Sequence, residues 1–444
     1  MKKNRAVYSV SIAFLCIIAA FFASVCVCTY RAQVYNEYDV VLNAEGANTS
    51  SSVAYDWSVE YPFSSEYNFI PREAAQAAEP ETEVSEQGSM ARYISAVKSI
   101  EDKIDYYTTK LLPGRMKFVE ANALFNKTVG MKIISGTDAV VAMKNGYLTF
   151  ETHKTDTSQA AQSLKWFSNT LNEKGIDLLY IQYPSKEQEG NAMLPSGIAD
   201  YSNINANALL KGLDENGVKY VDMRSLLEKK NDDWYSNFFL TDHHWKPEAG
   251  VWAAGKIAEI LNRDYAYGIN DKIGELEAYT VDVYEKYCLG SQGRIATLTY
   301  AEPEDISLIY PKSKTSFTVR YNNDDEISGS FEETLFDKSN LDNTDYYNHS
   351  AYSTYLRGNK ALTRIRNNDC QNGKRLLVIG DSFNKCVVPY LAQTVENIDM
   401  LDRRYFNGSV LDYIEKTSPD IVLVGYTPTL IGNASTHSST FNFE

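Results

Sequence analysis

The sequence has little cysteine and no excess of positive charge. Six cysteines occur in 444 residues, three in the apolar N-terminus and three spread through the remainder without CxxC spacing. This distribution excludes a disulfide scaffold and a cysteine-based zinc site, although a pair between Cys370 and Cys386 stays open. Lys and Arg number 43 against 58 Asp and Glu, a formal net charge of −15. Such a chain repels phosphate backbones, so nucleic acid is not an expected partner.

The N-terminus carries one long apolar run. Three basic residues precede an uncharged stretch from Ala6 to Tyr30. As a helix it would extend roughly 37 Å at about 1.5 Å per residue, enough to cross a membrane. Since it is longer than the apolar region of a cleaved signal peptide, and residues 20–24 make a poor cleavage site, we expect an uncleaved signal anchor. The rest of the chain would then lie outside the cell membrane, and a cleaved signal, the alternative, would export it too.

Composition divides the chain further. Residues 1–31 are the expected cytoplasmic tip and transmembrane helix, and residues 32–90, rich in Ser, Ala and Glu, predict a solvated linker. Residues 91–430 predict one main domain, in which the polar stretch around 265–368 is interpreted as an inserted region. Residues 431–444 remain as a C-terminal tail.

The main domain alternates continuous apolar runs, typical of strands buried on both faces, with helical patterns. Strands are expected at 140–143, 147–150, 176–184, 218–223, 374–380, 398–402 and 420–426, and helices at 93–112, 158–174, 204–216, 387–396 and 409–418. This alternation predicts a parallel sheet covered by helices on both faces, an α/β fold of three layers.

Ser382 follows directly after one of the buried strands, in the run Leu-Val-Ile-Gly-Asp-Ser-Phe. In an open α/β sheet the ligand lies beyond the carboxyl ends of the strands, where a helix N-terminus supplies N–H groups. A serine there is placed as a nucleophile, with its own N–H available to an oxyanion. The alternative is that Asp381 or Ser382 only caps the next helix.

A second chemically active run is Thr-Asp-His-His-Trp at 241–245. In an extended segment the side chains of Asp242 and His244 would point to one side and that of His243 away. A carboxylate beside an imidazole fixes its tautomer and stabilises the imidazolium after it takes a proton from serine, so the pair supplies what Ser382 lacks. The adjacent histidines also suggest a metal site as an alternative, but no further ligand cluster lies nearby in the sequence, and we expect no metal.

Together these motifs resemble the SGNH-hydrolase-like domain of the alginate O-acetyltransferase family, and the Asp-His-His-Trp tetrapeptide resembles its Gram-positive DHHW branch. The resemblance covers about residues 129–425 and includes the runs Gly-Asp-Ser-Phe at 380–383, Leu-Gly-Ser at 289–291, Arg-Gly-Asn at 357–359 and Asp-Arg-Arg-Tyr at 402–405. Asp and His precede Ser, an order permuted relative to ordinary SGNH hydrolases. The resemblance implies an SGNH-hydrolase-like fold, a flavodoxin-like parallel sheet in three layers.

The resemblance also implies a catalytic triad in which Ser382 is the nucleophile, His244 the general base and Asp242 its orienting acid. His243 stands where the alginate enzymes have a small polar residue, so it is the alternative base.

Gly290 and Asn359 are the candidates for further oxyanion donors that the resemblance implies, and each could instead be a turn residue. Arg403 and Arg404 are candidates for binding an anionic sugar, with a solvated or salt-bridged pair as the alternative. No cofactor is expected.

The expected function is therefore an extracytoplasmic, membrane-anchored O-acetyltransferase that modifies a cell-envelope or exported polysaccharide. The resemblance implies a polytopic membrane-bound O-acyltransferase as the partner that supplies acetyl groups. A polysaccharide acetyl esterase has the same triad and is one alternative. A non-catalytic polysaccharide-binding assembly subunit is the other.

Overall fold

The computed structural model describes residues 115–134, 139–230, 233–342, 344–431 and 440–444. The expected signal anchor, the linker and the helix at 93–112 lie outside these residues. In the described ranges no helix is both long and apolar enough to cross a membrane. The chain forms two compact units, and residues 126–444, which include the candidate site, belong to one of them. Helix α6 (Arg115–Thr128) begins in the other.

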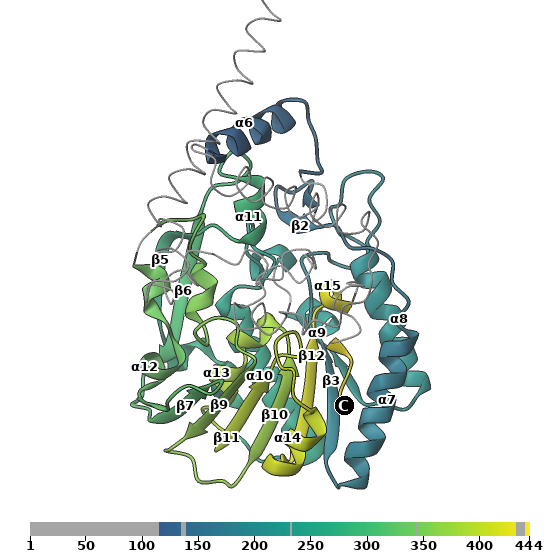
Figure 1. The fold of residues 1–444 in the computed structure, drawn as a ribbon, viewed down its shortest axis with the longest axis vertical. Helices are drawn as coiled ribbons and strands as arrows, with labels where there is room; N and C mark the ends of the chain where they lie inside the picture. Colours follow the sequence, from purple (N-terminus) through teal and green to yellow (C-terminus); the bar gives the residue numbers. More distant parts are fainter. Residues whose placement is uncertain (1–114, 135–138, 231–232, 343, 432–439) are drawn as a thin grey trace, which may run out of the picture. The chain divides into compact units, whose positions relative to one another are not determined.

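An eight-stranded sheet forms the centre of the larger unit, in the order β4-β3-β12-β10-β11-β9-β7-β8 (Figure 1). Its strands are β3 (Asp177–Gln182), β4 (Tyr220–Asp222), β7 (Phe317–Tyr321), β8 (Ile327–Gly329), β9 (Leu362–Asn367), β10 (Arg375–Gly380), β11 (Asn397–Leu401) and β12 (Ile421–Tyr426). The first five in the spatial order are parallel, as predicted. The next three pair antiparallel, so the sheet is mixed.

The expectation of a wholly parallel sheet is therefore wrong for β7, β8 and β9. Strand β7 alternates buried and half-buried residues, whereas every residue of β12 is buried. Alternation is typical of antiparallel strands with one solvated face, and continuous burial of parallel strands covered on both faces. The sequence around 265–368 lacks continuous apolar runs for this reason.

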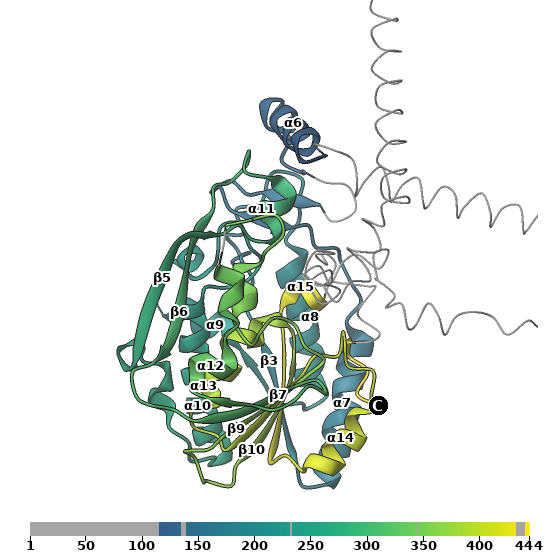
Figure 2. The same cartoon turned by 60° about the vertical axis from the view of Figure 1, so that its left-hand side comes forward.

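Helices cover both faces of the sheet, because alternate side chains of each buried strand point to opposite sides. Leu376 and Val378 of β10 pack in one core cluster, and Leu377 and Ile379 in the other. Figure 2 shows α10 and α13 on one side and α7 and α14 on the other. These four helices and three others have the following bounds: α7 (Ser158–Glu173), α8 (Tyr201–Glu215), α9 (Met223–Lys229), α10 (Pro247–Tyr265), α13 (Val388–Leu391), α14 (Val410–Thr417) and α15 (Pro428–Ile431). The predicted three layers are present.

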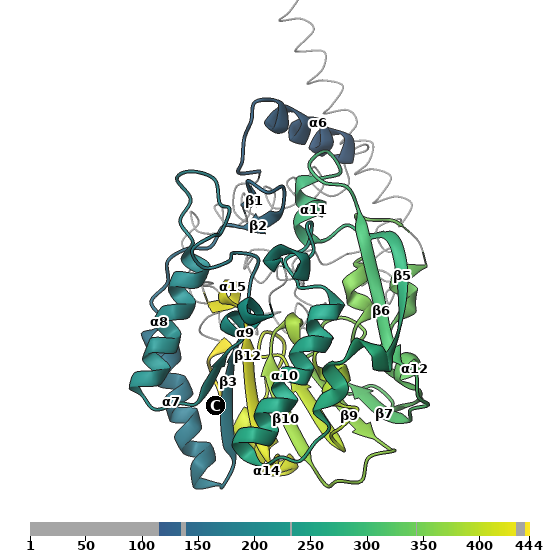
Figure 3. The same cartoon turned by 180° about the vertical axis from the view of Figure 1, so that it is seen from behind.

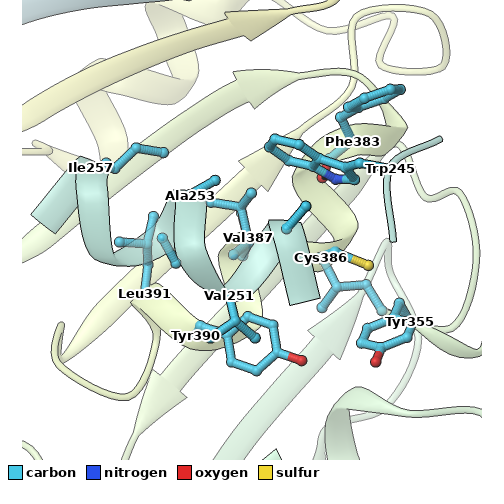
Figure 4. Packing of buried hydrophobic residues seen from close by; sticks show 14 of the residues in the cluster. Trp245, Val251, Ala253, Ile257, Tyr355, Phe383, Cys386, Val387, Tyr390 and Leu391 are labelled. Carbon is cyan, nitrogen blue, oxygen red and sulfur yellow. The ribbon is translucent and has the colours of Figure 1, made fainter. Parts of the chain in front are cut away.

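In Figure 3, which views the sheet from the side opposite to Figure 1, helix α10 lies in front of the strands, and it packs on the segment that follows β10. Figure 4 shows Val251 and Ala253 of α10 beside Val387 and Tyr390 in this part of the core. A Cβ on Gly250 would stand 2.3 Å from the Cys386 carbonyl oxygen, so only glycine allows the approach. Contact with α10 thus fixes the backbone just beyond β10.

The helix predicted at 387–396 is short in the structure. A 3-10 helix, η7 (Ser382–Cys386), follows β10, and α13 occupies only four residues after it. By contrast, α7 and α14 lie where predicted, and α8 begins three residues before the predicted start, since Asp200 caps it by accepting a hydrogen bond from the Asn203 N–H.

The region predicted as an insertion has two parts. Strands β5 (Tyr279–Cys288) and β6 (Glu304–Pro311) form a separate two-stranded sheet, joined by a loop that contains α11 (Ser291–Ala296). Strands β7 to β9 extend the main sheet, with α12 (Phe331–Leu335) beside them. Another antiparallel pair, β1 (Val140–Ala142) and β2 (Leu148–Phe150), matches prediction. Cys370 and Cys386 form no disulfide, so the pair that the sequence left open does not form.

Candidate active site

Ser382 lies at the carboxyl end of β10, as its motif predicts, and is about 6% exposed. The preceding Asp381 caps η7, because its Oδ1 accepts the Phe383 N–H at 3.0 Å. Its Oδ2 accepts from the N–H and hydroxyl of Thr427, just after β12, at 2.8 and 2.9 Å. Asp381 therefore ties together the ends of two neighbouring strands and fixes the backbone at Ser382. Asp381 therefore caps η7, the alternative that the sequence left open, and Ser382 also lies at the carboxyl end of its strand.

Residues 238–245 form a closed bend, not the extended segment that the sequence suggested. Phe238 and Trp245 pair as an antiparallel bridge across its base. Inside the bend the Asp242 Oδ1 accepts the His244 backbone N–H at 3.0 Å. His243 consequently does not point away: its ring centroid lies 3.8 Å from that of His244.

The bend brings His244 to Ser382. The His244 Nε2 lies 2.6 Å from the Ser382 Oγ, and the Nδ1 lies 2.5 Å from the Asp242 Oδ1. Since a carboxylate can only accept at Nδ1, the proton belongs there, and Nε2 accepts from the serine hydroxyl. Asp242 and His244 are each 1% exposed, so this chain of hydrogen bonds is shielded from water.

The charge state of Asp242 follows from its neighbours. Burial by itself raises the pKa of this carboxyl, but His244 and His243 and the hydrogen bonds from His244 and Ser291 outweigh it and hold the pKa well below its usual range. The Ser291 N–H donates to Oδ2 at 2.7 Å. Asp242 is therefore ionised at neutral pH and can stabilise an imidazolium.

Aromatic rings enclose His244. The Tyr352 ring stacks on it with centroids 3.8 Å apart and planes 16° apart, and the Tyr352 hydroxyl donates to the Ser382 carbonyl at 3.4 Å. The Phe383 ring centroid lies 5.4 Å from that of the same imidazole. The Trp245 Nε1–H donates to the Phe383 carbonyl. Sequence reasoning missed Tyr352, because the chain has 32 tyrosines and no local pattern marks this one.

Gly290 does not have the oxyanion-donor role that the resemblance implied. Its N–H donates to the Thr241 Oγ1 at 3.0 Å, so this donor is engaged within the protein and is not an oxyanion donor. A Cβ at this position would stand 2.1 Å from the Asp242 Cβ. The residue is a glycine because the backbone passes directly against Asp242.

The expected sugar-binding role of Arg403 and Arg404 does not hold either. The Arg404 guanidinium pairs with Asp402 at 2.6 Å and is 7% exposed at the side chain. Arg403 donates to the carbonyls of Phe406 and Gly408. Both side chains hold the turn after β11, Arg404 through its salt bridge and Arg403 through main-chain carbonyls. Asn359 lies in the loop that leads into β9, and an oxyanion role for it stays a prediction.

Asp242, His243 and His244 also form a group whose possible metal-binding atoms lie within 4.8 Å of one another. Both ring nitrogens of His244 already have partners in Asp242 and Ser382, and the His243 Nδ1 lies 2.8 Å from the Ser291 Oγ. A cation on this group would have to displace the contact between His244 and Asp242. The arrangement fits proton transfer better than metal binding.

Comparison with known proteins agrees with the resemblance predicted from the motifs. Residues 143–342 match the family model described as the SGNH hydrolase-like domain of the acetyltransferase AlgX. The match includes Asp242 and His244 and ends before Ser382. No curated protein sequence matches the chain.

Solved structures show the same fold. Bacillus cereus PatB1 is similar with a TM-score of 0.56 and 22% identity, over 69% of this chain and 100% of PatB1, and a PatB1 structure with a sulfonyl adduct gives 0.55 at the same identity, over 69% and 99%. A DHHW family protein from Eubacterium siraeum gives 0.51 at 19% identity, over 69% of this chain and 95% of its own. The larger unit thus has an SGNH-hydrolase-like α/β fold.

Proposed function

We propose that this protein is an extracytoplasmic, membrane-anchored O-acetyltransferase that modifies a cell-envelope or exported polysaccharide. The observation that carries the proposal is the buried hydrogen-bond chain from Asp242 through His244 to Ser382. The match of residues 143–342 to an acetyltransferase family model supports the reaction class. A sulfonyl adduct in PatB1 also fits, because sulfonylating reagents react with activated nucleophiles.

In the first step the Ser382 Oγ attacks the acetyl carbonyl of a donor while His244 Nε2 takes the hydroxyl proton. The bond between the acetyl carbon and the donor breaks, and the imidazolium returns the proton to the departing atom. In the second step a sugar hydroxyl gives its proton to His244 and attacks the acetyl-serine ester, and the proton returns to Ser382. Asp242 stabilises the imidazolium in both steps. The Ser382 N–H, with Asn359 as a further candidate, would donate to the oxyanion.

A membrane-bound O-acyltransferase partner would supply the acetyl group, and an N-terminal anchor would hold the domain close to it, raising its effective concentration. Transfer rather than hydrolysis requires that the bound acceptor sugar exclude water from the acetyl-serine, and this is what the acceptor experiment below tests.

The test is to react the full-length protein with 4-nitrophenyl acetate, with and without neutral and anionic oligosaccharides, and to measure nitrophenol, acetate and acetylated sugar. We expect a burst of nitrophenol and transfer of acetyl to at least one sugar. Ser382→Ala should abolish both, while Ser225→Ala, at an exposed serine of α9, should leave both unchanged.

Two other outcomes would contradict the proposal. Steady release of acetate with no acetylated sugar in the presence of any acceptor would indicate an esterase. Nitrophenol release no faster than from the Ser382→Ala variant would indicate a non-catalytic subunit.

A further inference from the structure

The Leu240–Thr241 peptide group, one residue before Asp242, is held at both of its polar ends by side chains of opposite charge. Its N–H, that of Thr241, donates to the Glu304 Oε1 at 2.6 Å. Its carbonyl, that of Leu240, accepts from the Lys186 Nζ at 3.1 Å. Charged partners make stronger hydrogen bonds than neutral ones, so this single peptide plane is fixed on both sides.

Glu304 binds the bend at more than one point. Its Oε2 accepts the Leu240 N–H at 2.8 Å, and its Oε1 also accepts the Thr241 hydroxyl at 2.7 Å. Both carboxylate oxygens therefore act as acceptors, and the three donors lie on two successive residues. Glu304 begins β6, more than sixty residues from the bend.

Lys186 enters from the opposite side of the peptide. It is 1% exposed, and its Nζ also donates to the Leu148 carbonyl and, at 2.7 Å, to the Gln292 Oε1. Burial lowers the pKa of Lys186 to about 8, while the charges of Glu304, Asp242 and Glu187 oppose that effect. At neutral pH the Lys186 ammonium is charged, and Glu304 is the carboxylate that stabilises this charge most.

The fixed peptide passes its orientation to Asp242 through Thr241. The Thr241 Oγ1 accepts from Gly290 and its carbonyl accepts the Gly293 N–H at 2.7 Å, so every polar group of this residue is engaged. Asp242 is the next residue, and its side chain must meet Ser291 with one oxygen and His244 with the other. A small rotation at Thr241 would break one of these contacts.

We propose that Glu304 and Lys186 are positioning residues that clamp the Leu240–Thr241 peptide and thereby hold Asp242 in line with His244 and Ser382. The inference rests on the proposed function for its effect on rate, since the clamp touches none of the reacting atoms. Misplacement of a reacting group by about 1 Å can cost about 100-fold in rate.

Glu304→Gln is the sharpest variant, because it keeps the shape of the side chain and removes one acceptor. An amide nitrogen would face an N–H donor of the bend, and that contact would open. Glu302→Gln is the matched control: the same change two residues earlier, at a side chain 87% exposed. Lys186→Met tests the other half of the clamp.

The first measurement is made on the full-length protein by NMR and does not need activity. The His244 ring signals are followed against pH, because the Asp242 carboxylate aligned on Nδ1 favours the charged imidazolium. In Glu304→Gln and Lys186→Met we expect the pH midpoint of these signals to move to lower pH, and in Glu302→Gln to stay. An unchanged midpoint in folded Glu304→Gln would overturn the inference.

The second measurement is the rate of acetyl-serine formation from 4-nitrophenyl acetate, with the melting temperature of each variant. We expect Glu304→Gln to lose between about 10- and 100-fold while most of the protein stays folded. A loss that matches the unfolded fraction alone would indicate a purely structural role and overturn the inference. Absence of a Ser382-dependent reaction in the wild type would overturn the proposed function, and the NMR midpoint would still decide the clamp.

Discussion

At the scale of single residues, the site depends on a chain of contacts in which the state of each group is set by the next. Asp242 is held ionised by two histidines and by the Ser291 N–H, and it in turn determines which nitrogen of His244 carries the proton. That nitrogen decides whether His244 can accept from Ser382. Neutralising the Asp242 carboxylate would therefore prevent His244 from accepting the Ser382 proton.

Asp242→Asn tests this dependence directly. The amide keeps the volume of the carboxylate but can present an N–H to Nδ1, which would shift the ring proton to Nε2 and leave Ser382 without a base. We expect acetyl-serine formation to fall by about 10⁴-fold with the fold retained. Burst kinetics on the variant, beside Asp214→Asn at an exposed position of α8, measure the effect. A loss of less than tenfold would contradict the assigned role.

The burial of Lys186 should make the free energy of unfolding depend on pH. Burial lowers its pKa to about 8, whereas in the unfolded chain the pKa returns to about 10.4. Between these values the unfolded state binds more protons, so the free energy of unfolding should rise with pH. Relative to Lys186→Met, the wild type should gain about 3 kcal/mol from pH 8 to pH 10.5. Urea unfolding at several pH values measures this, and a flat difference would refute it.

Local sequence patterns predicted Ser382, Asp242 and His244, because each lies in a short motif whose chemistry is recognisable from the residue types. Glu304 and Lys186 carry no such signal. The peptide that they hold lies more than fifty residues from either of them, so only the fold reveals the contact. Gly290 was predicted as an oxyanion donor or a turn glycine, whereas the structure requires a glycine there because the backbone passes directly against Asp242.

At the scale of helices and strands, continuous apolar runs were the reliable signal. Strands β3, β10 and β12 are buried along almost their whole length, and the sequence predicted each of them. Strands β7 and β9 have a solvated face and mix polar with apolar residues, which hid them. The bend at 238–245 escaped prediction because it is closed by backbone hydrogen bonds, which no side-chain pattern records.

The C-terminal tail provides a prediction at this scale. Phe443 is 1% exposed and stacks on Phe167 of α7 with ring centroids 4.4 Å apart. Phe443→Ala should lower the free energy of unfolding by about 3 kcal/mol, because it removes a buried ring and leaves a cavity. Urea unfolding checks this. Phe125→Ala, at a ring 63% exposed, should change it by less than about 0.5 kcal/mol, and equal effects would contradict the account.

At the scale of the whole molecule, the alternation of strands and helices was enough to predict three layers, the parallel strands of the sheet and a serine at the carboxyl end of one of them. It could not predict that three strands would extend the sheet antiparallel, since those depend on contacts between distant segments. The expected division of the chain into anchor, linker, main domain and tail stays a prediction.

Residues 1–31 lie outside the described residues, and their expected role as an uncleaved anchor can be tested in cells. The full-length chain should remain with the membrane after an alkaline wash, and protease added from outside should reach the main domain. A chain lacking residues 1–31 should be lost from the membrane fraction. Recovery of the full-length chain in the wash would contradict the anchor.

The most direct test of the central claim is to find which residue carries the acetyl group. The full-length protein is mixed briefly with 4-nitrophenyl acetate, quenched in acid and digested, and the acetylated peptide is sequenced by mass spectrometry. The account predicts a single acetyl ester on Ser382, lost in Ser382→Ala and strongly reduced in His244→Ala. Acetyl on another residue, or a yield unchanged in the Ser382→Ala variant, would contradict it.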